Sequence, residues 1–131
     1  MAEKVMPVLL PWSSALVSEF EQAGFTPLIV SELAQLGQVW RFDSLKVVIR
    51  AEGSELVWMA TLGEGTKEHA HNVLMIAKRA GAQTMRFHID DDERAILRFW
   101  RKYKPTPIHG DEGLGPGAYR IELEALDESF T

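Results

Sequence analysis

The sequence predicts a single α+β domain in which a mixed, mostly antiparallel sheet is flanked by helices. The length of 131 residues lies near the commonest domain size, and the composition, 46% hydrophobic and 25% charged, is typical of globular proteins. Along the chain, segments with an apolar residue at every second position alternate with segments of helical periodicity. One core is therefore expected over residues 1–126, followed by a short acidic tail over residues 127–131.

The first half of the chain is dominated by strand patterns. The short apolar segment Val5–Leu10 predicts a first strand, and Ser13 or Ser14 caps a helix that closes near Gly24. From Pro27 to Thr61 the pattern has period two with many β-branched residues. It predicts a meander of three antiparallel strands separated by short turns, namely Gln38–Phe42, Leu45–Arg50 and Glu55–Thr61.

The second half alternates helices and strands. Thr66 is expected to cap a helix with one apolar stripe, which ends at Gly81. The segment Thr84–Ile89 predicts a strand, and the aspartates that follow it cap a last helix that reaches Tyr103. After a glycine-rich loop, the alternating segment Tyr119–Leu123 predicts the closing strand.

Several classes of protein are excluded by composition. Without cysteine the chain has no disulfide, no thiolate metal site and no cysteine nucleophile. A net charge of −5 argues against a protein that coats nucleic acid through its overall field. The longest apolar run has about seven residues, far short of the roughly 20 that span a bilayer. We expect no membrane span and, without a secretory signal pattern, a cytoplasmic location.

The histidines do not predict a metal site. His69 and His71 lie two apart on a predicted helix, so their side chains point about 200° apart and cannot share one ion. His88, Asp90 and Asp92 could serve a magnesium-assisted nuclease, but aspartates at this place also cap the next helix. No further carboxylate motif accompanies them, so we favour the capping interpretation and predict no metal.

The order of the predicted elements resembles the GNAT superfamily of N-acetyltransferases. The best local match is a glycine followed by a strand, then a helix rich in aromatic and basic residues, then a strand with tyrosine. In this chain these are residues 81–89, 96–104 and 119–121. The resemblance covers most of the chain and implies a GNAT fold with acetyl-CoA as the cofactor of an active member.

The resemblance also implies where the cofactor would bind. In GNAT enzymes a loop of small residues opening a helix holds the pyrophosphate of acetyl-CoA, because its free backbone N–H groups and the helix dipole favour an anion. Gly63, Gly65, Thr66 and Lys67 occupy this place here. A strand-to-helix turn also requires glycine for its own geometry, so the pattern alone has two interpretations.

Three positions depart from the GNAT pattern. Ala60 stands where the family has Gln or Arg, Glu64 places a negative charge inside the phosphate loop, and Trp100 takes the position of the family's tyrosine acid. An indole does not donate a proton at neutral pH, which leaves Tyr103, one helical turn later, as the candidate acid. Asp43 and Glu55 could act as bases through water, but nothing separates them from solvated turn residues.

These departures favour a catalytically degenerate GNAT-like protein that acts by binding. The segment Leu97–Arg101 resembles a stretch of the small internal virion protein of short-tailed bacteriophages, which implies a virion or assembly component, inside a virion or the host cytoplasm. The alternative is an active acetyl-CoA-dependent N-acetyltransferase. The sequence alone does not separate the two.

The last predicted helix carries the strongest cluster of basic residues. Arg94, Arg98, Arg101 and Lys102 are expected on its outer face, in a chain that is acidic as a whole. Such a face could bind an acidic protein partner, nucleic acid or the adenosine phosphate of CoA, or be the solvated side of an amphipathic helix. We expect a protein partner here, and Trp12 beside a proline is a second candidate anchor for one.

Overall fold

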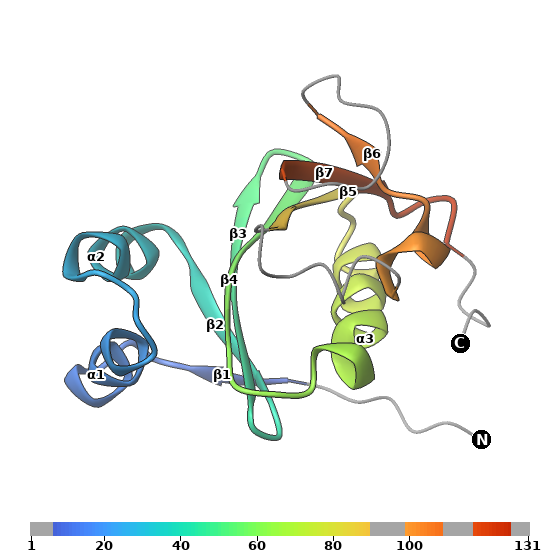
Figure 1. The fold of residues 1–131 in the computed structure, drawn as a ribbon. Helices are drawn as coiled ribbons and strands as arrows, with labels where there is room; N and C mark the ends of the chain where they lie inside the picture. Colours follow the sequence, from blue (N-terminus) through green and yellow to red (C-terminus); the bar gives the residue numbers. More distant parts are fainter. Residues whose placement is uncertain (1–6, 90–98, 109–116, 127–131) are drawn as a thin grey trace.

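A computed structural model describes residues 7–89, 99–108 and 117–126. They form one α+β domain built on a seven-stranded sheet with the order β1-β2-β3-β4-β5-β7-β6. Helices α1 and α2 lie on one face of the sheet and α3 on the other (Figure 1). This confirms the predicted fold class. No helix among these residues is long and apolar enough to cross a bilayer.

The elements of the first half follow the meander pattern closely. Strand β1 and helices α1 and α2 precede three antiparallel strands that pair in sequence order. Their bounds are β1 Val8–Leu10, α1 Ser14–Gln22, α2 Pro27–Leu36, β2 Gln38–Phe42, β3 Leu45–Glu52 and β4 Glu55–Leu62. The predicted strands of the meander are therefore confirmed, with small shifts at their ends.

The second half returns the chain to the sheet twice. Helix α3 is a crossover that makes β5 parallel to β4, and β7 then adds antiparallel to β5. A two-residue strand, β6, pairs with β7 at the far edge, which the sequence did not predict. The bounds are α3 Thr66–Arg79, β5 Thr84–Ile89, a 3-10 turn η2 at Arg101–Tyr103, β6 Thr106–Pro107 and β7 Gly117–Glu122.

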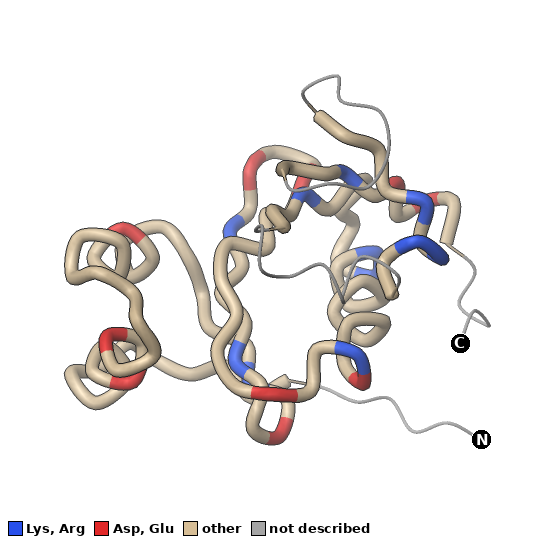
Figure 2. Tube along the Cα trace, viewed as in Figure 1, with Lys and Arg blue, Asp and Glu red and all other residues tan. Residues whose placement is uncertain are grey.

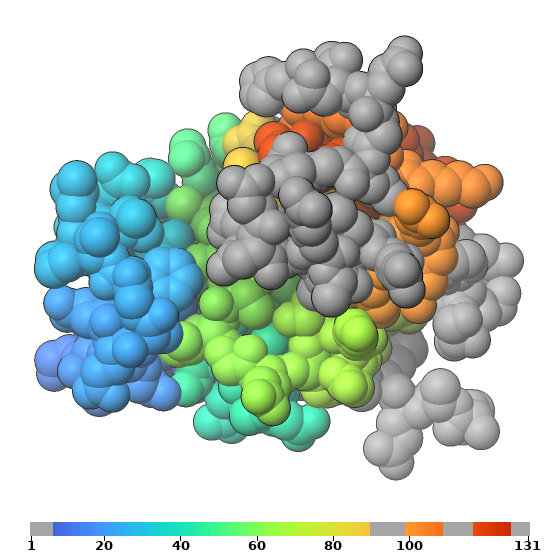
Figure 3. Space-filling view, viewed as in Figure 1, coloured from blue at the N-terminus to red at the C-terminus, as the bar shows by residue number. Residues whose placement is uncertain are grey.

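The sheet separates two hydrophobic cores. The larger lies between the sheet and α3 and contains Trp58, Phe87 and Trp100. The smaller lies under α1 and α2 around Phe20 and Val48. In the space-filling view α1 and α2 form one end of the molecule, beside the strands and α3 (Figure 3). We call these two sides of the sheet the α3 face and the α2 face.

Two predictions about helices were wrong. Residues 27–36 form α2 and not an extension of the strand pattern; Thr26 accepts a hydrogen bond from the N–H of Ile29, and Pro27 occupies the first turn. Thr66 is not a cap but the first residue of α3, whose N-cap is Gly65 at φ 116° with no side-chain cap. Most of the predicted last helix, residues 90–98, lies outside the described residues, as does the tail 127–131.

Candidate functional site

Strands β4 and β5 diverge halfway along β4. The parallel pairing joins Glu55–Trp58 to Thr84–Phe87 and then stops, whereas β4 continues to Leu62. A bulge marks the same point, because the β3 ladder passes from Trp58 to Ala60 and leaves Met59 without a partner. The side of residues 59–62 that faces β5 therefore has no neighbouring strand among the described residues.

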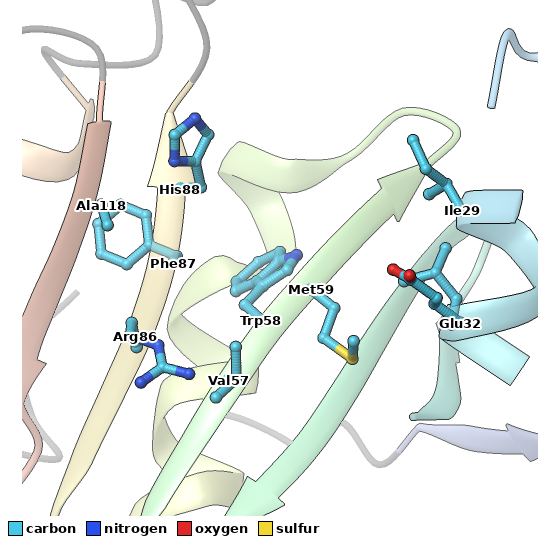
Figure 4. Close-up of a pocket in the computed structure, with 10 residues that line it drawn as sticks. Ile29, Glu32, Val57, Trp58, Met59, Arg86, Phe87, His88 and Ala118 are labelled. Carbon is cyan, nitrogen blue, oxygen red and sulfur yellow. The ribbon is translucent and has the colours of Figure 1, made fainter. Parts of the chain in front are cut away.

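A cavity of about 310 Å³ lies at this divergence on the α2 face. Helix α2 forms one wall with Ile29 and Leu33 and contributes the carboxylate of Glu32, while Phe87 and His88 come from β5 (Figure 4). The remaining lining comes from β4, β5 and β7, namely Val57, Trp58, Met59, Arg86 and Ala118. The size and the mainly apolar walls suit a small organic ligand.

Three aromatic rings close the cavity toward the α3 face. The ring of Trp100 stacks on Phe87 with centroids 4.6 Å apart and meets Trp58 edge-on at 5.7 Å. Each of the three residues is at most 6% exposed. The indole Nε1 of Trp58 donates a hydrogen bond to the Thr61 hydroxyl at 2.7 Å, so the ring reaches along β4 toward its unpaired segment. The opening between β4 and β5 is thus filled by side chains.

The loop that enters α3 has the geometry of an anion site at its helix end. The backbone N–H groups of Thr66, Lys67 and Glu68 have no hydrogen-bond partner within the part of the chain that is described. Lys67 is exposed beside them, and so is Glu64. The four predicted residues Gly63, Gly65, Thr66 and Lys67 are therefore neighbours around one helix end.

Both glycines are also required by the turn itself. Gly63 has φ 89°, and a Cβ there would lie 2.3 Å from the carbonyl oxygen of Ser44. Gly65 has φ 116° and would bring a Cβ within 3.3 Å of the His69 ring. The turn between β2 and β3 therefore packs against this loop, and the glycine pattern has a structural reason that is independent of any ligand.

Tyr103, the candidate acid, is turned away from the cavity. It is 3% exposed, its ring stacks on His71 of α3, and its hydroxyl lies 3.4 Å from Nδ1 of that histidine. Burial raises the pKa of Tyr103 to about 12. Burial, with the charges of Lys102 and Arg79, lowers the pKa of His71. Tyr103 is absent from the described lining of the cavity.

An ion-pair network occupies the α2 face beside the cavity. Glu55 is 12% exposed at its side chain and accepts hydrogen bonds from Arg120, from Arg86 at 3.1 Å and from the Thr84 hydroxyl at 2.8 Å. Arg86 also pairs with Glu52. The hydrogen bond from Arg120 lowers the pKa of Glu55, against the effect of burial. Glu55, proposed as a base from sequence, is engaged in holding β4, β5 and β7 together.

Other predicted site residues are only partly described. Arg101 and Lys102 are exposed on η2, whereas Arg94 and Arg98 lie outside the described residues. Trp12 is half-buried: its Nε1 donates to the carbonyl of Gly37 at 3.0 Å, so it fastens the start of α1 to the end of α2.

The histidines face different neighbours. Nε2 of His69 lies 3.2 Å from Asp43, whereas His71 contacts Tyr103. Among the described residues no three acidic or histidine side chains are grouped in a way that could hold a metal ion. Asp90 and Asp92 fall outside that part of the chain.

The sequence pointed to the loop before α3 as a candidate phosphate site but not to the cavity. Glu32 and Ile29 lie on the helix that the period-two interpretation missed, and Trp58 lies in the predicted strand Glu55–Thr61, whose pattern gives it no site role. The signal for the helix was present in Thr26 and Pro27, a cap followed by proline at the first helical position. Nothing in the local sequence marks the divergence after Trp58, because strand pairing is set by distant segments.

Comparison with solved structures identifies the fold. No protein-family model and no curated protein matches the sequence. A Bacillus subtilis acetyltransferase solved in complex with CoA is 13% identical with a TM-score of 0.65, over 91% of this chain and 99% of that one. An IAA acetyltransferase from Bacillus cereus is 11% identical with a TM-score of 0.66, over 88% and 97%.

A third similar structure carries the superfamily's name. An acetyltransferase of the GNAT family from Staphylococcus aureus is 8% identical with a TM-score of 0.59, over 89% of this chain and 99% of that one. Each of the three structures covers at least 88% of this chain and at least 97% of its own chain is covered, with TM-scores from 0.59 to 0.66. The chain therefore has the fold of the GNAT acetyltransferases.

Proposed function

We propose that this chain is a catalytically degenerate GNAT-fold protein that acts by binding and does not transfer acetyl groups. One observation carries the proposal: Trp58, Phe87 and Trp100 fill the opening between β4 and β5. If the α3 helix end holds the phosphate of acetyl-CoA, the thioester arm must cross this opening to meet an acceptor in the cavity on the α2 face. With the opening filled, the two sites do not communicate.

The residues present fit one end of acetyl-CoA and not the other. The three free N–H groups at the start of α3 and the exposed Lys67 suit a phosphate, although Glu64 opposes it. The thioester arm has no open site beside β4, since the rings of Trp58, Phe87 and Trp100 fill its path and are each at most 6% exposed. The chain therefore fits acetyl-CoA incompletely, and no transfer step follows from its geometry.

The position of the candidate acid also supports an inert protein. A proton donor must reach the reacting group and have a pKa near the working pH. The hydroxyl of Tyr103 faces His71, and burial raises its pKa to about 12. Trp100, at the position that the GNAT resemblance gives to the acid, has no titratable proton in this range. Neither aromatic residue meets both requirements.

An acetyl-transfer assay tests this proposal. The purified protein is incubated with acetyl-CoA and a panel of amines, and free thiol is measured; we expect no release above the no-enzyme rate. Trp100→Tyr restores the family's residue and serves as the informative variant. A folded Trp100→Tyr protein without thiol release agrees with a degenerate site, whereas clear turnover by the unmodified protein overturns the proposal.

An active acetyl-CoA-dependent N-acetyltransferase is the second candidate. Two observations favour it, namely the free N–H groups beside Gly65 and the cavity of about 310 Å³ next to the divergence. If acetyl-CoA binds through this helix end, Glu64→Gln strengthens binding by removing a repulsive charge. The exposed Glu21→Gln on α1 is the matched control, and an equal effect of both substitutions would show that the phosphate lies elsewhere.

For the binding partner we propose a protein with an acidic surface. The chain would then be a component of a phage virion or of its assembly complex, located in the virion or in the host cytoplasm. Basic residues gather at η2 and the end of α3, whereas α1 and α2 carry acidic ones (Figure 2). Arg101 and Lys102 are exposed there. Reversing both to Glu should abolish binding to polyglutamate at low salt and leave the thermal midpoint nearly unchanged.

Lys67→Glu is the control for that experiment, because Lys67 is also exposed but lies at the other end of α3. Binding of a single-stranded oligonucleotide in preference to polyglutamate would replace the acidic protein with nucleic acid as the partner. A large loss of stability in the double reversal would instead give the two basic residues a structural role.

A further inference from the structure

We infer that Trp58, held by its hydrogen bond to Thr61, is the residue that excludes an extended ligand arm from the unpaired edge of β4. This inference deepens the proposed binding function and rests on it. Of the three rings that fill the opening, it assigns the exclusion of the ligand to Trp58, because this residue belongs to β4 and hydrogen-bonds to the unpaired segment of that strand.

The edge of β4 that follows Trp58 has the backbone groups that an extended chain could pair with. Between Met59 and Leu62 the β5 side of β4 has no neighbouring strand within the described residues, although its other side is paired with β3. An unpaired strand edge presents N–H and C=O groups that an extended molecule with amide groups can pair with. The segment ends where the loop to α3 begins, so it joins the helix end to the cavity.

The indole lies on the α3 face of this segment. Trp58 belongs to the core between the sheet and α3, whereas Met59, Ala60 and Leu62 pack into the core under α1 and α2. The Nε1–Thr61 hydrogen bond, 2.7 Å long, spans three residues of the same strand and directs the ring along the edge. The side chain of Trp58 thereby also forms part of the floor of the α2-face cavity.

Neighbouring rings keep the indole in this position. Trp100 contacts it edge-on at 5.7 Å and is itself stacked on Phe87 across the opening. Phe87 is the residue paired with Trp58 in the parallel ladder. The indole is therefore fixed by a hydrogen bond on one side and by packed rings on the other, and interiors packed in this way leave little room for a ligand.

Removing the indole should open the path from the α3 helix end to the cavity. We expect Trp58→Ala to bind CoA at least tenfold more tightly than the unmodified protein, in a titration followed by calorimetry. Loss of the fold would lower CoA binding, so a gain is the informative direction of change, and a control variant separates it from a general loosening of the core. Pantetheine, the arm alone, should gain in the same way, whereas adenosine 3′,5′-bisphosphate, the phosphate end alone, should not.

Trp40→Ala is the matched control. Trp40 is a buried tryptophan of the same core on β2, two strands away from the opening. Its truncation creates a cavity of similar size that does not lie on the proposed path, so CoA affinity should stay within twofold. An equal gain in both variants would show that loosening of the core, and not the position of Trp58, admits the ligand, and would overturn the inference.

Thr61→Val tests the anchor without removing a large side chain. Thr61 is exposed, and valine keeps its shape and removes the acceptor of the indole N–H. We expect CoA binding to strengthen about threefold, and this variant decides the matter if Trp58→Ala does not fold.

The inference and the proposed function fail in different ways. Unchanged CoA affinity in folded Trp58→Ala, or in Thr61→Val if the first variant does not fold, contradicts the inference and leaves an inert protein. Micromolar binding by the unmodified protein contradicts the proposed function itself.

Discussion

At Trp100 the contribution of the ring to stability can be measured separately from the absence of a catalytic acid at this position. It is 4% exposed and contacts Phe87, Trp58, Phe99 and Tyr103 through its ring. Truncating a buried tryptophan to alanine costs about 3 to 5 kcal/mol, which combines lost transfer free energy with the cavity left behind. Each aromatic pair adds about 0.5 to 1.5 kcal/mol, so Trp100→Ala should fall in the upper part of that range.

Urea denaturation measures this loss. With a slope of about 2 kcal/mol per molar, a loss of about 4 kcal/mol lowers the unfolding midpoint by about 2 M. Trp100→Tyr keeps a ring against Phe87 and should lose less than half as much. Leu36→Ala is the control, since Leu36 is 46% exposed on α2 and its truncation should change stability by less than about 0.5 kcal/mol.

A small effect at Trp100 would refute this reasoning. If Trp100→Ala lowers the free energy of unfolding by less than about 1 kcal/mol, the ring does not fill the opening between β4 and β5. The closure by three aromatic rings would then be wrong, and the structural basis for an inert protein would be lost.

Three further predictions concern the network, the loop and Tyr103. Glu55→Gln should destabilise the protein by about 2 kcal/mol at pH 7. Because the native pKa of Glu55 is lowered, the difference in stability between the unmodified protein and this variant should disappear in melts recorded as the pH falls below that pKa. A difference that stays constant with pH would show that the ion pairs of Glu55 do not stabilise the fold. Gly63→Ala should lower the thermal midpoint clearly, since its Cβ would meet the Ser44 carbonyl at 2.3 Å; an unchanged midpoint would mean a looser loop. Absorbance at alkaline pH should show a phenol ionising near pH 12 that Tyr103→Phe lacks, and stability should fall between about pH 10 and that value, because the unfolded chain loses the proton first. Ionisation of this residue near pH 10 would show that it is exposed.

Much of the fold was predictable because local patterns and turn residues agree with it. The three strands of the meander, α1, α3 and β5 follow from periodicity and from residues such as Asp43 and Gly53, which adopt positive φ at the two hairpin turns. Helix α2 was missed because the three consecutive apolar residues 28–30 in its first half resemble a strand when the cap at Thr26 is disregarded. The helix is stabilised by tertiary packing, because Val30 and Leu33 on its inner side pack against Val48 of β3.

The candidate site was less predictable, because it depends on contacts between distant segments. The loop before α3 could be located from Gly63 and Gly65, since glycine at a strand-to-helix turn is a local signal, whereas its role as a phosphate site stays a prediction. The closure of the opening requires Trp58, Phe87 and Trp100 to meet, and they are brought together by β4, β5 and the chain that follows β5. The burial of Tyr103 against His71 likewise depends on how η2 packs on α3.

The most direct test of an inert, closed GNAT fold is calorimetric titration of the unmodified protein with acetyl-CoA. The filled opening and the charge of Glu64 predict a dissociation constant weaker than about 100 μM, which corresponds to a binding free energy of no more than about 5.5 kcal/mol in magnitude. A dissociation constant in the low micromolar range would contradict the closure and would favour an active acetyltransferase.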